Sequence, residues 1–186
     1  MDDLISGGGG TCTLVPAADA DVPHIVALMN RAYRTAASAS AWTTEAGYIS
    51  GDRTTETLLR ADLAASPAAS LMTWRDPGED ALTGCVWLEP LGDDVWYLGS
   101  LTVDPDRQNA RLGRTLLAAS EQWIVERGGT RVRMTVVNVR TALIAWYRRR
   151  GYRETGEINP FPYGDNRFGT PQRDDLSFVV LERELG

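Results

Sequence analysis

The order of β-rich and helical segments is the feature that most constrains the fold. Residues 70–75, 82–88 and 95–103 are rich in strand-forming residues, and clusters of Asp, Pro and Gly separate them. Closely spaced strands of this kind form an antiparallel meander. A helix with an apolar stripe follows at residues 113–127, and a Gly-Gly pair ends it. A meander followed by a crossover helix predicts a mixed sheet with helices on its faces.

The remaining segments complete this pattern. Further strands are predicted at residues 11–15, 131–137, 152–158 and 176–181, and further helices after Asp19 or Asp21, at 54–65 and at 140–150, where Gly151 is placed to end the helix. The result is an α/β (α+β) fold with a mixed, mostly antiparallel sheet of about seven strands flanked by helices. Residues 1–10 are expected to be a flexible lead-in, and residues 11–186 a single domain.

Charge and residue usage exclude several function classes. The net charge of −6 argues against nucleic-acid binding, and the absence of lysine removes a P-loop lysine, a pyridoxal Schiff base and a lysine nucleophile. With one histidine, His24, and two separated cysteines, Cys12 and Cys85, we expect no metal site. No apolar run or leader pattern indicates a membrane, so a cytoplasmic protein with buried thiols is expected, with a disulfide as the alternative.

A charged turn joins the strand at 95–103 to the following helix. The first N–H groups of a helix and its dipole form an anion site, and Arg107, Arg111 and Arg114 add positive charge there. A solvated loop with a polar cap would use the same residues. Spacing alone does not decide between these two interpretations.

The chain resembles the GCN5-related N-acetyltransferase (GNAT) superfamily over nearly its whole length beyond residue 11. Two stretches carry the motifs of this resemblance. "LGSLTVDPDRQNARLGRTLL" has its strand, Val-Asp-Pro turn, pyrophosphate loop and helix in order, and Gln108 and Gly113 match the loop pattern Gln/Arg-x-x-Gly-x-Gly/Ala. "MTVVNVRTALIAWYRRRGYRETGE" resembles its second signature, and the C-terminal stretch resembles a bacterial subgroup that acetylates small amines. Arg111 departs from the pattern, because it stands where the family has a glycine. Its side chain leaves less space for the phosphate, but its guanidinium can contact the phosphate directly.

The resemblance implies an N-acetyltransferase in which an amine, on a small molecule or a peptide, attacks acetyl-CoA directly in a ternary complex. It implies that the backbone from residue 101 to 103 holds the pantetheine arm and that the loop takes the pyrophosphate. Asn138 would bond the arm, or would only cap the next helix. The implied cofactor-binding residues are Leu101, Thr102, Val103, Gln108, Asn109, Ala110, Arg111, Leu112, Gly113, Arg114, Asn138 and Tyr147.

Tyr147 is the catalytic candidate that the resemblance implies, because the matching residue often protonates the departing thiolate. At its helical spacing it would otherwise be an ordinary core aromatic. Many relatives have a glutamate base on the strand before the loop, but residues 95–103 contain no carboxylate. Glu89 on the preceding strand is therefore the first choice for the base, and a water relayed through Tyr97 or Ser100 is the alternative.

The acceptor is expected to meet the segments around the cofactor core. Trp42, Tyr97, Phe161 and Tyr163 are the predicted substrate-binding residues, because aromatic rings suit an amine, although each also fits plain loop packing. The alternative function is a non-catalytic acyl-CoA-binding sensor, which the missing carboxylate and Arg111 keep open. A homodimer suits this architecture, but no stripe in the sequence demands one.

Overall fold

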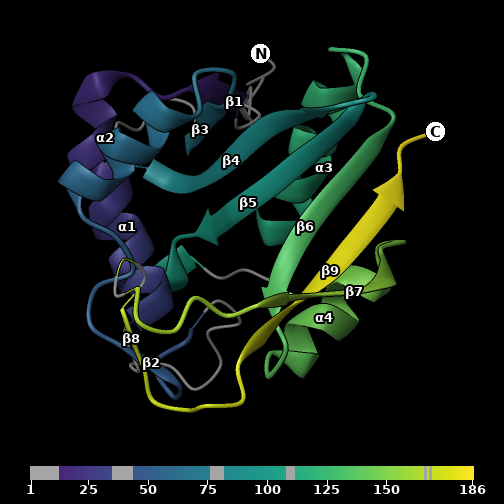
Figure 1. Cartoon of the computed structure of the whole chain (residues 1–186). Coiled ribbons are helices and arrows are strands. Elements are labelled where there is room, and N and C mark those ends of the chain that lie inside the picture. Colours follow the sequence, from purple (N-terminus) through teal and green to yellow (C-terminus); the bar gives the residue numbers. More distant parts are fainter. Residues whose placement is uncertain (1–12, 35–43, 76–81, 108–111, 166, 168) are drawn as a thin grey trace, which may run out of the picture.

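The computed structural model describes residues 13–34, 44–75, 82–107, 112–165, 167 and 169–186. Its main strands are β1 (Thr13–Pro16), β3 (Ser70–Arg75), β4 (Leu82–Gly92), β5 (Val95–Val103), β6 (Arg131–Val137), β7 (Arg153–Pro160) and β9 (Ser177–Glu184). They form one sheet in the order β1-β3-β4-β5-β6-β9-β7 (Figure 1). Only β5 and β6 pair in parallel. The prediction of a mixed, mostly antiparallel sheet of seven strands is confirmed.

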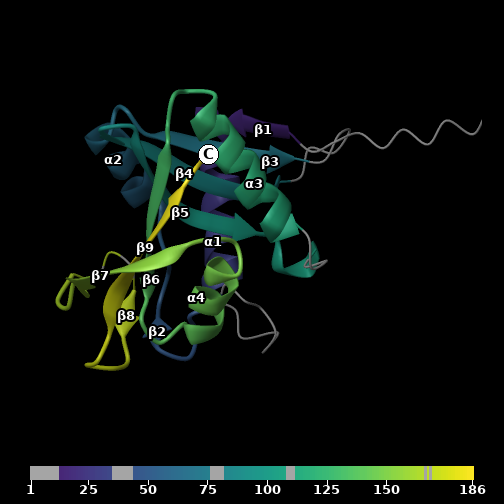
Figure 2. The ribbon, with the colours of Figure 1, turned by 90° about the vertical axis from the view of Figure 1, so that its right-hand side faces the viewer.

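Helices cover both faces of this sheet (Figures 1 and 2). They are α1 (Val22–Arg34), α2 (Glu56–Ala65), α3 (Leu112–Val125) and α4 (Thr141–Arg148), with short 3-10 turns η1 (Asp19–Asp21) and η2 (Pro105–Arg107). Alternate residues of β4 point to opposite faces. Val86 and Leu88 pack with α3 and α4, whereas Cys85 and Trp87 pack with α1 and α2.

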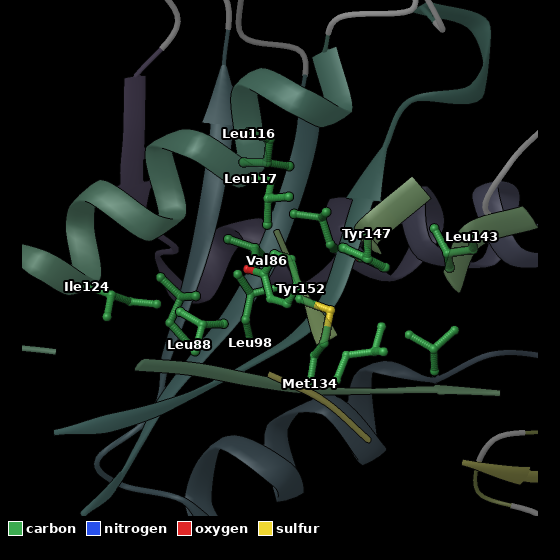
Figure 3. Close-up of a cluster of buried hydrophobic side chains, with 14 of the residues drawn as sticks. Val86, Leu88, Leu98, Leu116, Leu117, Ile124, Met134, Leu143, Tyr147 and Tyr152 are labelled. Atoms are coloured by element: carbon green, nitrogen blue, oxygen red, sulfur yellow. The ribbon is translucent and has the colours of Figure 1, made fainter. Parts of the chain in front are cut away.

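The larger core lies between the sheet and α3. Leu116, Leu117 and Ile124 of α3 lie against Leu88 and Leu98 of the sheet, and none of the five is more than 2% exposed (Figure 3). Burying an aliphatic side chain of this size contributes roughly 1.5–3 kcal/mol. This core therefore fixes the position of α3 on the sheet, and with it the place where the charged turn ends.

Two predicted boundaries shift, and one pair of strands was not predicted. The helix predicted at 54–65 begins at Glu56, because the side chain of Thr55 accepts the N–H of Leu58 and caps it. Strand β4 continues to Gly92, and only Asp93 and Asp94 form the turn, with φ of 49° and 58° as two-residue hairpins require. A two-stranded ribbon of β2 (Ile49–Ser50) and β8 (Thr170–Pro171) was not predicted, since two residues give no periodic signal.

Gly151 ends α4, as predicted from the sequence. Its φ is +91°, and two further hydrogen bonds close the last turn: Tyr152 N–H to the Tyr147 carbonyl at 3.2 Å, and Gly151 N–H to the Arg148 carbonyl at 3.1 Å. This pair of bonds around a left-handed glycine is the Schellman motif. The motif holds the C-terminal end of the helix that carries Tyr147.

Replacing Gly151 by alanine is expected to lower the free energy of unfolding by about 1–2 kcal/mol, because the new Cβ disfavours the left-handed backbone. Urea denaturation measures the change. Gly47→Ala is the matched control, since a Cβ there meets no atom within 4 Å and its φ is not positive. Equal denaturation midpoints for the two variants would show that the glycine cap does not contribute to the stability of the fold.

Candidate active site

Strands β5 and β6 begin side by side and then diverge (Figure 1). Residues Val95, Trp96 and Tyr97 of β5 pair with residues 131–133 of β6. Beyond these pairs β6 stays bound to β9 through Val137, whereas no strand of the described chain pairs with the β6-facing edge of β5. The second half of β5 therefore presents backbone N–H and C=O groups to an opening in the sheet.

A β-bulge lies in the part of β5 that borders this opening. Cys85 pairs with Thr102 and Trp87 with Gly99, so β5 has one more residue than β4 between the two pairs. The extra residue is accommodated by Ser100, whose φ is +50°. A slip in the apolar alternation, from residues 96 and 98 to residues 101 and 103, is the sequence signal of this bulge.

A cavity of about 580 Å³ extends through the opening between the two strands. Tyr33 of α1 and Leu59 of α2 line it from one face of the sheet, and Leu143 and Tyr147 of α4 line it from the other. Residues of β5 and β6 form its rim, and they include Gly99, Ser100, Leu101, Met134 and Thr135. One cavity can reach both faces only because β5 and β6 do not pair there.

Tyr147 is a buried tyrosine in the lining of this cavity. Its side chain is 5% exposed, and its ring packs edge-on against Trp146 and Tyr152 at centroid distances of 4.9 and 5.5 Å (Figure 3). Burial raises the pKa of the Tyr147 phenol well above its usual value, since the phenolate would lose its hydration. The hydroxyl therefore keeps its proton at neutral pH.

Two of the predicted substrate-binding residues line the cavity. The Tyr97 hydroxyl of β5 lies 3.2 Å from the Thr135 hydroxyl of β6, so a hydrogen bond spans the opening. Phe161 is 7% exposed and stacks on Phe178, with ring centroids 5.5 Å apart. The cavity thus combines an aromatic wall with hydroxyl groups on β5 and β6.

Three other predicted residues lie outside the cavity lining. The Glu89 carboxylate accepts the Trp87 indole N–H at 3.0 Å, and Glu89 is the cross-strand neighbour of Tyr97. The Tyr163 ring is 5.2 Å from that of Phe161, but the residue is 45% exposed and its hydroxyl accepts the N–H of residue 176. The Asn138 amide bonds the backbone of residues 175 and 177, which joins it to the start of β9. Their proposed roles stay predictions.

Some predicted residues fall outside the described part of the chain: Cys12, Trp42, Gln108, Asn109, Ala110 and Arg111. Leu112, Gly113 and Arg114 form the first turn of α3. The pKa of Arg150, at the end of α4, is lowered first by burial and then by the neighbouring charges of Arg114 and Arg149. Positive charge from the first turn of α3 and from the residues that follow α4 therefore lies on the same face of the sheet.

Sequence patterns did not reveal a buried charge cluster in the cavity wall. The Glu45 carboxylate accepts from Arg34 at 2.7 Å and lies 3.5 Å from the Arg140 guanidinium, and all three side chains are about one-tenth exposed or less. These residues come from three separate segments, so no local motif joins them. The one signal that the sequence offered is that Glu45 is the only carboxylate between Asp21 and Asp52.

Other features bear on cofactors and compartment. Cys85 is fully buried, and burial raises the pKa of its thiol to about 12, which makes it unreactive. Within the described residues, no three side chains of the metal-ligating types gather closely enough to hold an ion. No helix in the described ranges has both the length and the apolar character needed to cross a bilayer.

Comparisons with known proteins agree with this geometry. The family model described as the acetyltransferase (GNAT) family matches residues 28–152. The mycothiol acetyltransferase of Clavibacter sepedonicus is 40% identical over 88 residues, which are 46% of this chain and only 28% of that protein. The chain therefore matches less than a third of that relative's length.

Solved structures share the fold. The ribosomal-protein-S18-alanine N-acetyltransferase of Escherichia coli superposes with a TM-score of 0.66, at 17% identity and 95% coverage of each chain. The PaiA N-acetyltransferase of Thermoplasma acidophilum, in complex with coenzyme A, superposes with a TM-score of 0.63, at 13% identity and with 94% of this chain and 99% of that chain covered. At these identities the similarity concerns the fold alone.

Proposed function

The chain belongs to the acetyltransferase (GNAT) family, and we propose that this acetyltransferase moves the acetyl group of acetyl-CoA to a primary amine by direct attack in a ternary complex. The observation that carries the proposal is the unpaired edge of β5 beside a cavity that passes through the sheet. An extended pantetheine arm can bond such an edge as an added strand does. The described residues therefore fit acetyl-CoA.

The fit extends to the phosphates of the cofactor. The N-terminal end of α3 carries the positive end of a helix dipole, and Arg114, Arg149 and Arg150 add charge at the same face. A diphosphate held there would direct the arm toward the opening between β5 and β6. Leu101, Thr102 and Val103 of β5 are the residues that we assign to the arm.

Acetyl-CoA supplies the acetyl group as a thioester, and the chain's own residues manage the two protons of the transfer. The amine nitrogen forms the new bond to the acetyl carbon as the bond to sulfur breaks. Tyr147 Oη donates a proton to the leaving sulfur and afterwards regains one from the medium, and the amine releases one to water, so the protons balance. We assign that water to the hydroxyls of Tyr97, Thr135 and Ser100, which line the cavity, and the final proton to Glu89, the cross-strand neighbour of Tyr97.

Two measurements test the proposed function. Acetyl-CoA is expected to raise the melting temperature, since a ligand present at 100 times its Kd stabilises the native state by about 2.7 kcal/mol. Chromatography is expected to show free CoA and an acetylated amine in equal amounts. Unchanged melting with acetyl-CoA would refute the site, and stabilisation without turnover of any amine would favour the acyl-CoA sensor.

A further inference from the structure

The charges that line the cavity do not cancel. Among the described lining residues are three arginines, Arg53, Arg140 and Arg167, and two carboxylates, Glu45 and Asp62. Glu45 pairs with Arg140 and also with Arg34 behind the wall, and Asp62 pairs with Arg167. The described wall thus has more positive than negative charge, although the chain as a whole has a net charge of −6.

Arg53 is held in place by a built arrangement. The Asn30 side chain accepts the N–H groups of Arg53 and Thr54 at 2.6 and 3.2 Å and donates to the Thr54 carbonyl at 2.9 Å. These bonds tie the residues before α2 to α1. They fix the backbone from which the Arg53 side chain reaches the cavity.

Arg53 and Arg140 converge on Tyr33. Their guanidinium carbons lie 5.3 and 5.9 Å from the centroid of its ring, and the Tyr33 hydroxyl donates to the Leu101 carbonyl at 3.4 Å. Two positive charges therefore lie beside the bulged part of β5. They are on the α1 and α2 face of the sheet, whereas the cations assigned to the cofactor's phosphates are on the α3 and α4 face.

We propose that the acceptor is a small amine that also carries an anionic group, a carboxylate or a phosphonate, and that Arg53 and Arg140 bind this group. The inference rests on the proposed function and specifies its acceptor. An anion beside two guanidinium groups forms charge-assisted hydrogen bonds, and these are stronger where the groups are partly buried, as Arg53 and Arg140 are. A purely cationic amine would instead bring its ammonium against like charges. The aromatic side chains of Trp87, Tyr97 and Phe161 remain to contact the carbon skeleton.

Matched amines provide the test. β-Alanine and 2-aminoethylphosphonate carry an anionic group two carbons from the amine, and propylamine has a similar length without it. L-Phenylalanine and L-phenylalaninamide form a bulkier pair, and spermidine represents a polycation. At equal concentrations of the deprotonated amine, we expect kcat/KM for the better anionic probes to exceed that of their neutral partners by at least about tenfold. A difference between β-alanine and the phosphonate would identify the preferred anion.

Variants connect this preference to Arg53. Arg53→Gln is expected to raise KM for the anionic probes by at least about tenfold and to change kcat little. For propylamine, which loses a like charge and no partner, KM should fall or stay the same. Arg53→Lys keeps the charge without the planar fork and should give an intermediate KM. Arg60→Gln, on α2 outside the cavity, is the matched control and should behave as the wild type. Melting curves of each variant establish that it is folded.

The outcomes separate the two proposals. Equal kcat/KM for anionic and neutral probes, turnover of spermidine alone, or an anion preference that Arg53→Gln leaves unchanged would overturn this inference while acetyl transfer itself stands. A protein that acetyl-CoA stabilises but that acetylates no amine would instead refute the proposed function.

Discussion

Tyr147→Phe is expected to lower kcat by about a hundredfold or more, because a positioned general acid contributes roughly 10²- to 10⁴-fold to a proton-transfer step. The phenyl ring keeps the packing against Trp146 and Tyr152, so affinity for acetyl-CoA should change little. Steady-state kinetics with the best amine of the panel measure kcat, and calorimetric titration measures acetyl-CoA affinity. Because burial keeps the pKa of Tyr147 high, the loss should be the same at every pH from 7 to 9.

Tyr152→Phe is the matched control for this prediction. Tyr152 belongs to the same aromatic cluster, but its hydroxyl donates to Glu121 at 2.8 Å and it is not among the cavity-lining residues. Removing the Tyr152 hydroxyl should lower the free energy of unfolding by about 1–3 kcal/mol, because the buried Glu121 carboxylate loses a hydrogen-bond donor. The substitution should leave kcat unchanged. If the Tyr147→Phe enzyme had the wild-type kcat, Tyr147 would be a core aromatic and not the general acid.

Glu45→Ala is expected to lower the free energy of unfolding by about 3–5 kcal/mol. The substitution leaves Arg34 and Arg140 almost buried without their shared carboxylate, and an uncompensated buried charge is expensive to keep out of water. Glu45→Gln keeps the volume but removes the charge, so it should also destabilise the fold, by less than alanine does. Urea denaturation of both variants measures the two effects.

An exposed ion pair supplies the control for Glu45. Glu154 lies 3.6 Å from Arg148, with side chains 45% and 66% exposed, so water already solvates both charges. Glu154→Ala should therefore denature close to the wild-type midpoint. If Glu45→Ala also denatured close to the wild-type midpoint, the buried cluster would not hold Arg140 in position. The proposed role of Arg140 in acceptor binding would then lose this argument.

Much of the fold could be predicted because the relevant signals are local. The strands Ser70–Arg75, Val95–Val103 and Arg131–Val137 have the predicted bounds, since the first two are rich in strand-forming residues beside turn clusters and the third alternates between apolar and polar residues. The end of the helix that carries Tyr147 could also be predicted locally, because Gly151 directly follows the helical pattern. The ribbon of β2 and β8 escaped prediction because its two segments are about 120 residues apart and too short to show a pattern.

The candidate site could be predicted only in part. The resemblance identified Tyr147, and the structure puts it in the cavity with Tyr97. Glu89 was chosen for its place at the end of a strand, but it is not among the cavity-lining residues, and its carboxylate accepts the indole N–H of Trp87, which does line the cavity. Tyr33, Arg53 and Arg140 gave no signal, because each is an ordinary residue of a helix or loop until the fold brings the three together.

The sequence by itself determined the kinds of the main secondary-structure elements, their order and the family, because each is encoded in neighbouring residues. The tertiary structure decided where β5 leaves β6, and therefore that a cavity joins the two faces of the sheet. It also decided which charges are buried together. Ion pairing and strand divergence depend on distances between segments that are remote in the chain, and no periodicity in the sequence records those distances.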